Sequence, residues 1–396
     1  MKVNKWTTGL AAAGVVSLAS VAQAGDANET VMTAVSSTTL SGYVSTTAIW
    51  NPGSGNFGGL PGSSFGAGSA SNQDGFNLDV ISLSVSKALD ESEWAAGYNA
   101  QLWFGETVGG IGGGQVVDDT IIKNANVDLR VPVGNGIDIK MGIFDSIIGY
   151  ESTDFNANPN YSRNYGWGLE PTTHEGVLVS YNVNEMVSVS AGIANANTPT
   201  LGANKAATGS GSDSQKSYMG AAALTAPDSM GFLSGATLYV GVLDGIVGGN
   251  TTDTTSVYVG ATIPTPVEGL AAGISWDYRL ESGPGSSGTG VAGAVSGAWA
   301  SALAGYLSYD VTEKISAHYR IDWAKGTDGT FGAGLNALNG TEDKLLSNTL
   351  TVDYKAWENV ISRLELRWDH SLDAVSRYGA NDRNDITVAA NVIYQF

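Results

Sequence analysis

The residues that could carry out chemistry in this chain are few and far apart. The three histidines, His174, His318 and His370, show no spacing typical of a metal site, and the sequence contains no cysteine. Residues 62–66 (GSSFG) fit the G-x-S-x-G pattern of a serine nucleophile, but the stretch is rich in Gly and Ser and no strand-to-helix turn is expected around it. Such a match arises by chance, so we assign no catalytic residue, no metal ligand and no cofactor.

Charged side chains recur instead at every second position of several segments. Residues 313–325 show the pattern most clearly, and 269–281 and 359–370 repeat it. In 313–325 the apolar set is Ile315, Ala317, Tyr319, Ile321 and Trp323, and the polar set is Lys314, Ser316, His318, Arg320 and Asp322. A period of two places the two sets on opposite faces of a β-strand. We expect the charged faces to line water and the apolar faces to meet lipid.

Sixteen segments of this kind can be marked along the chain. They are 40–50, 77–88, 93–104, 121–132, 136–144, 175–183, 186–194, 216–226, 235–244, 254–263, 269–281, 297–309, 313–325, 344–355, 359–370 and 385–396. Most have 9 to 13 residues. A tilted transmembrane strand needs about 9–11 residues, which is longer than a typical strand of a soluble domain.

The connections between these segments alternate between long and short. The odd connections have 26, 16, 30, 21, 9, 15, 18 and 14 residues, and the even ones have 4, 3, 2, 8, 5, 3 and 3. Short periplasmic turns and long outer loops produce this alternation. Because every backbone polar group must be paired in hydrocarbon, strands can span a bilayer only as a closed barrel. We therefore predict an all-β fold, a transmembrane antiparallel β-barrel of about 16 strands with a water-filled lumen. The sequence pattern also allows a barrel of 14 or 18 strands.

Composition supports an exported envelope protein. Charged residues make up 14% of the 396 residues, and the formal net charge is -19. Residues 1–24 contain Lys2, Lys5, an apolar run and the sequence Ala22-Gln23-Ala24, which together indicate a signal peptide removed after Sec export. Residues 25–396 then form one outer-membrane β-barrel domain of a Gram-negative envelope. The acidic excess argues against nucleic acid as a partner.

Several stretches resemble the OmpL-like β-barrel porin family. They are FNLDV at 76–80, WAAGY at 94–98, GNGIDIKMGIFDSIIGYE at 134–151, NPNYSRNYGWGLEPTTHEGVLVSY at 158–181, APDSMGFL at 226–233, ISRLELRWDH at 361–370 and NVIYQF at 391–396. The block at 134–181 is the most specific of these. The resemblance implies an outer-membrane porin fold and transport of small solutes.

The longest connection, 145–174, is the third outer loop, the position at which general porins fold a loop into the lumen. We hypothesise that it narrows the channel, with its acidic groups facing wall arginines so that a transverse field orients polar solutes. A solvated surface loop is the alternative. The candidate pore-lining and constriction residues are Arg130, Asp145, Glu151, Asp154, Arg163, Glu170, Asp277, Arg279, His318, Arg320, Asp322, Arg363, Glu365 and Arg367.

Two further groups of residues are typical of outer-membrane barrels. Val392, Tyr394 and Phe396 share one face at the C-terminus and resemble the signal read by the machinery that inserts outer-membrane barrels. Aromatic residues near segment ends are expected to form interfacial girdles. Those singled out are Trp50, Trp94, Tyr150 and Tyr309.

The acidic excess falls largely in the connections, where carboxylates could bind divalent cations that bridge to lipopolysaccharide, or could attract cations to the pore mouth. Examples are Asp118, Asp119, Asp213, Asp244, Asp253, Glu342, Asp343, Asp373 and Asp382. Expected partners are outer-membrane lipid and lipopolysaccharide, the barrel-assembly machinery, small solutes and, by analogy, two further copies in a homotrimer.

These observations predict an outer-membrane porin, not an enzyme, that allows passive diffusion of ions and small hydrophilic solutes. One alternative is a plugged structural or adhesive barrel, which would not conduct. The other is an outer-membrane hydrolase, which would lose activity on changing His318 or Ser64.

Overall fold

The computed structural model describes most of the chain beyond its N-terminal segment. The described residues are 38–52, 74–90, 92–105, 116–117, 120–197, 216–246, 253–282, 297–327, 331, 342–373, 376, 378 and 382–396. The expected signal peptide 1–24, the 62–66 motif with Ser64, and the loop carboxylates Asp118, Asp119 and Asp213 lie outside these residues.

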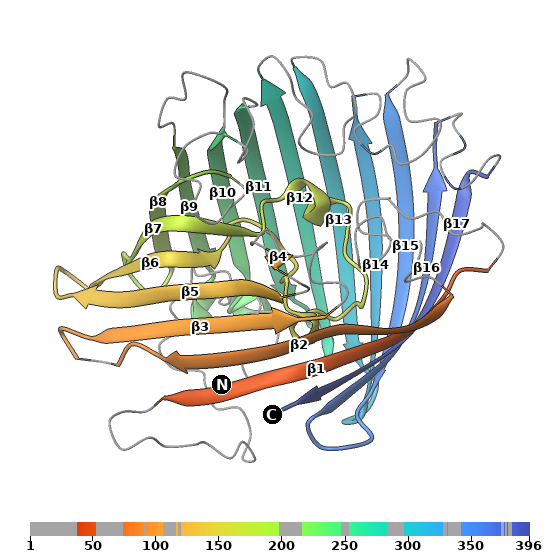
Figure 1. The fold of residues 1–396 in the computed structure, drawn as a ribbon, viewed down its shortest axis with the longest axis horizontal. Helices are drawn as coiled ribbons and strands as arrows, with labels where there is room; N and C mark the ends of the chain where they lie inside the picture. The colour runs from red at the N-terminus through yellow and green to blue at the C-terminus, as the bar shows by residue number, and fades with distance from the viewer. Residues whose placement is uncertain are drawn as a thin grey trace.

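Sixteen strands form one closed antiparallel barrel, in which each strand pairs with its neighbour along the chain and the last pairs with the first (Figure 1). The strands are β1 (Thr39–Trp50), β2 (Gly75–Lys87), β3 (Ala96–Phe104), β5 (Thr120–Val131), β6 (Ile137–Asp145), β7 (Thr173–Asn182), β8 (Val187–Ala194), β9 (Ser217–Thr225), β10 (Thr237–Ile246), β11 (Asp253–Pro264), β12 (Leu270–Ser282), β13 (Ala298–Asp310), β14 (Ile315–Gly326), β15 (Asp343–Tyr354), β16 (Val360–Ser371) and β17 (Asn384–Gln395). A two-residue strand, β4 (Val116–Val117), pairs with β5.

The predicted fold class and all sixteen predicted strands are confirmed, and the boundaries differ by at most three residues. The strand β4 was not predicted, because two residues carry no period. In the described part of the chain, no helix is long and apolar enough to cross a membrane.

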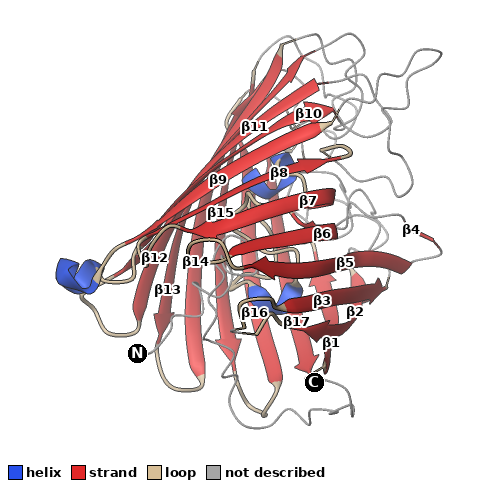
Figure 2. Ribbon diagram, turned by 90° about the vertical axis from the view of Figure 1, so that its left-hand side faces the viewer, coloured by secondary structure: helices blue, strands red, loops and turns tan. Residues whose placement is uncertain are grey.

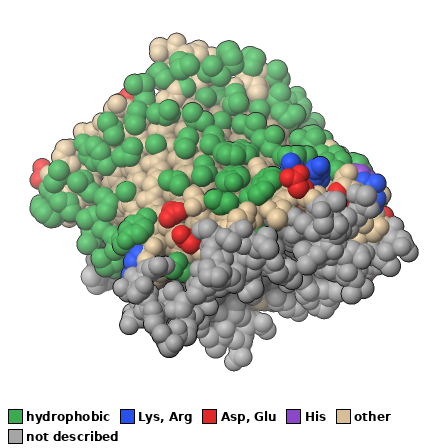
Figure 3. Space-filling view, turned by 90° about the horizontal axis from the view of Figure 1, so that it is seen from above, with side chains coloured by type: hydrophobic (Ala, Val, Ile, Leu, Met, Phe, Trp, Pro, Cys, Tyr) green, Lys and Arg blue, Asp and Glu red, His purple; other side chains and the backbone are tan. Residues whose placement is uncertain are grey.

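The outer face of the barrel is apolar. On β16, Leu364 and Leu366 are exposed, whereas the alternate residues Arg363, Glu365 and Arg367 are buried inside. Figure 3 shows hydrophobic side chains over most of the visible outer face, with most of the charged ones near its border. This division is what a lipid-facing wall around a polar interior requires.

Residues at the chain end and at the strand ends also lie on the outside. Val392, Tyr394 and Phe396 are exposed on the outer face of β17, and the Phe396 ring lies against Gly42 of β1. Trp50, Trp94 and Tyr309 are exposed near strand ends, as expected for interfacial girdles. Tyr150 was wrongly placed among these girdles, because it is buried inside the barrel, where its ring stacks on Tyr306 at 4.3 Å.

The connection between β6 and β7 positions the candidate site. Residues 146–172, called the inner loop below, contain two short 3₁₀ helices, η2 (Phe155–Ala157) and η3 (Gly166–Leu169). Figure 2 shows both within the outline of the barrel. A third 3₁₀ helix, η4 (Asp228–Leu233), lies in the turn between β9 and β10.

Candidate functional site: the inner loop and the lumen wall

The inner loop crosses the lumen and is hydrogen-bonded to strands on several sides of the barrel. Near one wall, the Tyr43 hydroxyl of β1 donates to Asp154 at 3.0 Å. Three strands away from β1, the Asn160 amide donates to Thr351 of β15 at 2.7 Å. Across the lumen from β1, the Tyr239 hydroxyl of β10 donates to the Ile147 carbonyl. The loop is therefore attached to walls that are far apart around the barrel.

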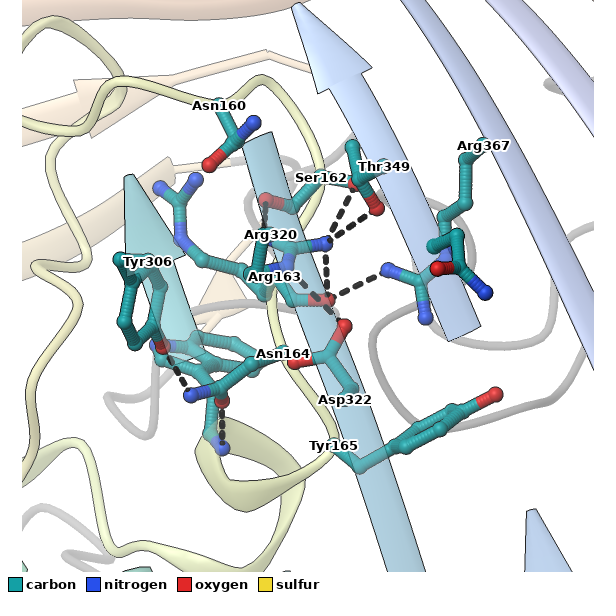
Figure 4. Close-up of polar contacts among 12 residues, drawn as sticks. Asn160, Ser162, Arg163, Asn164, Tyr165, Tyr306, Arg320, Asp322, Thr349 and Arg367 are labelled. Atoms are coloured by element: carbon teal, nitrogen blue, oxygen red, sulfur yellow. Dashed lines mark hydrogen bonds and ion pairs between the residues drawn. The ribbon is translucent and has the colours of Figure 1, made fainter. Parts of the chain in front are cut away.

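Arg320 of β14 is the centre of the largest group of contacts (Figure 4). Its guanidinium lies 2.9 Å from the Glu151 carboxylate of the inner loop and 3.0 Å from Asp322 on its own strand. It also donates to the carbonyl oxygens of Ser162 at 2.6 Å and Arg163 at 3.1 Å. A planar guanidinium with five N–H donors suits this role, because it can bind side-chain and backbone acceptors together.

Strand β16 supplies further contacts from its lumen face. Glu365 accepts the backbone N–H of Tyr161 at 2.6 Å and of Ser162 at 2.9 Å. Arg363 donates to the carbonyls of Phe155 and Asn158 at 2.8 and 2.5 Å. The wall thus binds the backbone of the loop, and charged groups make such hydrogen bonds strong.

Arg367 completes this side of the site. It donates to the Arg163 carbonyl at 2.5 Å and pairs with Asp369 at 2.8 Å. Asp369 in turn accepts the Tyr165 hydroxyl at 2.6 Å, and the Arg367 guanidinium lies over the Tyr165 ring. Each buried charge here has an opposite charge or a backbone partner, as burial requires.

The side formed by β10–β13 contacts the loop in a different way. The Asn164 amide donates to the Tyr306 hydroxyl, and Trp167 N–H donates to the Asn164 side chain (Figure 4). Glu170, which follows η3, lies within hydrogen-bonding reach of Asp277 on β12. A cavity of about 30 Å³ between the two ends of the loop is bordered by Glu170, Glu151 and Asp145 among others.

Burial shifts the ionisation of the loop residues. Loss of water raises the pKa of Asp154 and of Glu170, and the neighbouring Asp277 carboxyl raises the pKa of Glu170 further. Burial also lowers the pKa of Arg163 to about 10. The inner loop therefore contains two carboxyl groups that hold their protons more tightly than exposed ones.

The expected site residues are brought together only in part. Glu151 meets Arg320 as expected, but Asp154 accepts hydrogen bonds from Tyr43 and Gln101 and faces no wall arginine. The expectation for Arg130 was wrong: it pairs with Asp138 at 2.7 Å across the β5–β6 ladder, close to the turn, and does not contact the inner loop. Its strand position near the periplasmic end explains this.

The remaining expected residues also pair locally. Asp145 pairs with Lys123 of β5, and Arg279 pairs with Glu281 at 3.2 Å while reaching the Leu169 carbonyl at 3.4 Å. Sequence reasoning missed Lys123, because a β-bulge at this position of β5 turns the side chain inward, whereas a strict period of two places it on the apolar face with Val127 and Leu129. It also missed Asp79, which accepts the Tyr161 hydroxyl at 3.0 Å. The period-two pattern around 76–80 could have identified Asp79.

His318 lies on the lumen face of β14, hydrogen-bonded through Nδ1 to Ser308 at 2.7 Å, with Nε2 3.5 Å from Asp353. A Ser-His-Asp triad needs the opposite use of the two nitrogens. Asp353 also pairs with Arg363 at 3.4 Å, so the arrangement is a charge network and gives no support to a hydrolase. Among the described residues, no group of three or more His, Asp or Glu is placed to hold a metal ion.

A closed antiparallel barrel with an apolar outer face, a charged interior and a loop folded inside defines a porin-type protein of the bacterial outer membrane. Residues 37–396 match the family model described as "Putative beta-barrel porin-2, OmpL-like". The chain belongs to this family.

Solved structures share the fold at low sequence identity. The outer membrane channel DcaP of Acinetobacter baumannii matches with a TM-score of 0.59 and 12% identity, over 91% of this chain and 97% of that one. The anion-selective porin from Comamonas acidovorans matches at 0.55 and 12%, over 91% and 99%. The trimer form of OmpT from Vibrio cholerae matches at 0.55 and 12%, over the same shares. The comparison with curated proteins finds no match.

Proposed function

We propose that this protein is a narrow outer-membrane pore for passive diffusion of ions and small hydrophilic solutes, without catalysis. The observation that carries the proposal is the inner loop, which crosses a polar lumen and is attached to its walls. A sixteen-stranded barrel without such a loop has a wide aqueous channel. The loop then sets the width of the passage.

The charges beside the loop also bear on selectivity. The guanidinium groups of Arg320, Arg363 and Arg367 are occupied by carboxylates and loop carbonyls. They are therefore poorly placed to attract anions, whereas the formal charge of the whole chain is -19. We expect weak selectivity for cations, since an acidic surface raises the local cation concentration.

The test is single-channel conductance of the refolded protein in a planar bilayer under a salt gradient. A small, stable conductance with a cation-selective reversal potential is expected. A variant in which residues 152–168 are replaced by a short Gly-Ser linker should conduct more, because the loop no longer crosses the lumen. An anion-selective reversal potential would contradict the proposed role of the acidic charge.

A plugged barrel is the second candidate, and the wall contacts of the inner loop on β1, β10 and β14–β16 favour it. A silent wild-type protein whose loop-replacement variant conducts would establish the plug and reject the diffusion pore.

The proposal extends to the envelope context. Residues 1–24 are a signal peptide removed during Sec export, and Val392, Tyr394 and Phe396 are the signal for the barrel-assembly machinery. A homotrimer is included because the OmpT structure with the same fold is a trimer form. N-terminal sequencing of the mature protein and cross-linking in outer membranes test these points. Outer-membrane lipid and lipopolysaccharide surround the apolar wall.

A further inference from the structure

Two acidic side chains meet at the end of the inner loop. Glu170 comes from the loop and Asp277 from the lumen face of β12, and they are called the acid pair below. Asp277 is 3% exposed. One carboxyl oxygen of each residue, Oε1 of Glu170 and Oδ1 of Asp277, is buried without a hydrogen-bond partner in the structure. The two carboxyl groups nevertheless lie within hydrogen-bonding reach of each other.

The backbone of the loop closes tightly over the acid pair. A Cβ atom at Gly166 would collide with the Asp277 carboxylate, and one at Gly149 would collide with the Glu170 carboxylate. Gly149 also has a φ of +123°, which other residues rarely adopt. Glycine at these two positions allows the backbone of the loop to approach both acids closely.

No cation compensates the acid pair within the described part of the chain. Arg279, two residues along β12, pairs with Glu281 and donates to the Leu169 carbonyl. Arg320 pairs with Glu151, a third acid that adds negative charge near both members of the pair.

The other titratable groups that face the pair are Tyr150 of the loop and Tyr258 of β11. Both are buried, and neither can supply a positive charge.

Two carboxylates within hydrogen-bonding reach of each other, here the buried Asp277 and the half-buried Glu170, repel each other strongly unless a positive charge lies between them. We propose that Glu170 and Asp277 share one proton, and that this shared proton is a latch that fixes the end of the inner loop to β12. Loss of the proton leaves two adjacent carboxylates and releases the loop from this wall. The cavity that borders Glu170 gives the proton a route to water.

The sign of the pH effect follows from linkage. Burial and Asp277 raise the pKa of Glu170 above its value in the unfolded chain. The latch is then fully formed below the ordinary range of a glutamic acid, and it is lost as the pH rises through the raised value. Alkaline pH, not acid, should open it.

The first test detects the proton itself. Infrared difference spectra between about pH 5 and about pH 9 should show a protonated carboxyl band that titrates above the ordinary glutamic acid range. Asp154 also contributes to this band, so the band should be clearly weaker, not absent, in Glu170→Gln and in Asp277→Asn, and nearly unchanged in Asp128→Asn, whose carboxylate lies away from the inner loop. A band of equal strength in the wild type and in both pair variants, or no such band in the wild type, would overturn the proposal. Loss of the band on adding calcium chloride would also overturn it, by showing a cation site.

The second test detects release of the loop. Backbone hydrogen exchange in residues 166–172 should accelerate at least about tenfold as the pH rises, beyond the pH dependence of exchange in a control peptide. Exchange in residues 160–164 should not change in this way, because Arg320 and Arg367 still bind the Arg163 carbonyl. Glu170→Gln should show no such acceleration in 166–172, because its amide donates to Asp277 without a titrating proton. Equal acceleration in that variant would contradict the latch.

The consequence for conductance rests on the proposed pore function. Wild-type conductance should rise with pH and that of Glu170→Gln should not. If the wild type is silent but the infrared and hydrogen-exchange results hold, the latch stands and the pore function fails. If it conducts without the carboxyl band, the pore function stands and the latch is wrong.

Discussion

The two sides of the lumen hold the same loop by different chemistry. The charged side is formed by β14–β16 and comprises Arg320, Asp322, Arg363, Glu365, Arg367 and Asp369. The aromatic side is formed by β10–β13 and comprises Tyr239, Tyr258, Asp277 and Tyr306, with Tyr150 and Glu170 of the loop packed against it. The first side satisfies charge with opposite charge and with backbone dipoles. The second relies on ring packing, glycine backbone and an acid pair.

This difference determines which changes should release the inner loop from each side of the lumen. On the charged side, removing one partner leaves the others buried and uncompensated, which is costly at neutral pH. On the aromatic side, a steric change or the loss of one proton suffices. We therefore expect the two sides to separate in mutational and pH experiments.

The largest effect is expected for Arg320→Ala on the charged side. The change leaves the Glu151 and Asp322 carboxylates buried without their cation, at a cost of about 3–5 kcal/mol. Urea unfolding from lipid vesicles, followed by tryptophan fluorescence, measures the loss of stability. Trypsin should also cut after Arg163 in the folded variant.

Arg130→Ala is the matched control for this change. Arg130 pairs with Asp138 away from the inner loop, so its loop should stay resistant to trypsin. If Arg320→Ala leaves both stability and trypsin resistance unchanged, the charged side does not hold the loop.

A smaller effect is expected for Glu365→Gln. The carboxylate accepts two loop N–H groups, from Tyr161 and Ser162, and the Thr351 hydroxyl at 2.7 Å. A glutamine amide would turn an N–H group toward a donor, at a cost of about 1–3 kcal/mol. The same unfolding measurement checks this loss. Asp128→Asn, an isosteric neutralisation away from the loop, should have much less effect, and equal losses would refute the assignment.

Gly166→Ala tests the aromatic side without removing any charge. The new Cβ would collide with Asp277, and overpacking of this kind costs about 1–3 kcal/mol. We expect the end of the loop near η3 to move while the contacts of Arg320 persist. Hydrogen exchange should increase in 166–172 and not in 160–164. Uniform exchange across the whole loop would show that the two sides act as one unit.

The pH dependence of stability separates the sides further. Because the pKa of Glu170 is raised in the folded protein, Glu170 should lower wild-type stability by about 1.4 kcal/mol for each pH unit between its ordinary and its raised pKa, and the effect should level off above the raised pKa. Glu170→Gln should reduce the slope, leaving the contribution of Asp154, whereas Glu365→Gln should keep the full slope. Unfolding curves at a series of pH values provide the measurement, and an unchanged slope in Glu170→Gln would assign it to another group.

Most of the fold could be predicted from the sequence, because lipid on one face and water on the other impose a period of two that survives in every strand. The same period identified the lumen positions of Arg320, Arg363 and Arg367. The pairs of Arg320 with Asp322 and of Arg367 with Asp369 were not predicted, although both members of each pair lie two residues apart on one face of a strand.

The partners of the inner loop could not be predicted in this way. Arg363 and Arg367 bind loop carbonyls, and a backbone carbonyl has no signature in the sequence. The acid pair could not be predicted for another reason. The acidic residues of the loop were expected to face arginines of the wall, whereas Glu170 lies beside Asp277. A carboxyl group that burial keeps neutral can approach another acid in this way.

The smallest effect is expected for Lys140→Gln, at the periplasmic part of the lumen. Its ammonium lies 4.0 Å from Asp128, and both side chains are partly exposed. Solvent screens such a pair, so the change should cost less than about 1 kcal/mol and should leave trypsin resistance intact. It should still lower the local positive charge, and reversal potentials should shift toward stronger cation selectivity. Lys140→Gln should therefore destabilise the barrel much less than Glu365→Gln does. Equal losses would show that a charge anywhere in the interior contributes equally to stability, and the contrast between the loop contacts and the rest of the lumen wall would then be wrong.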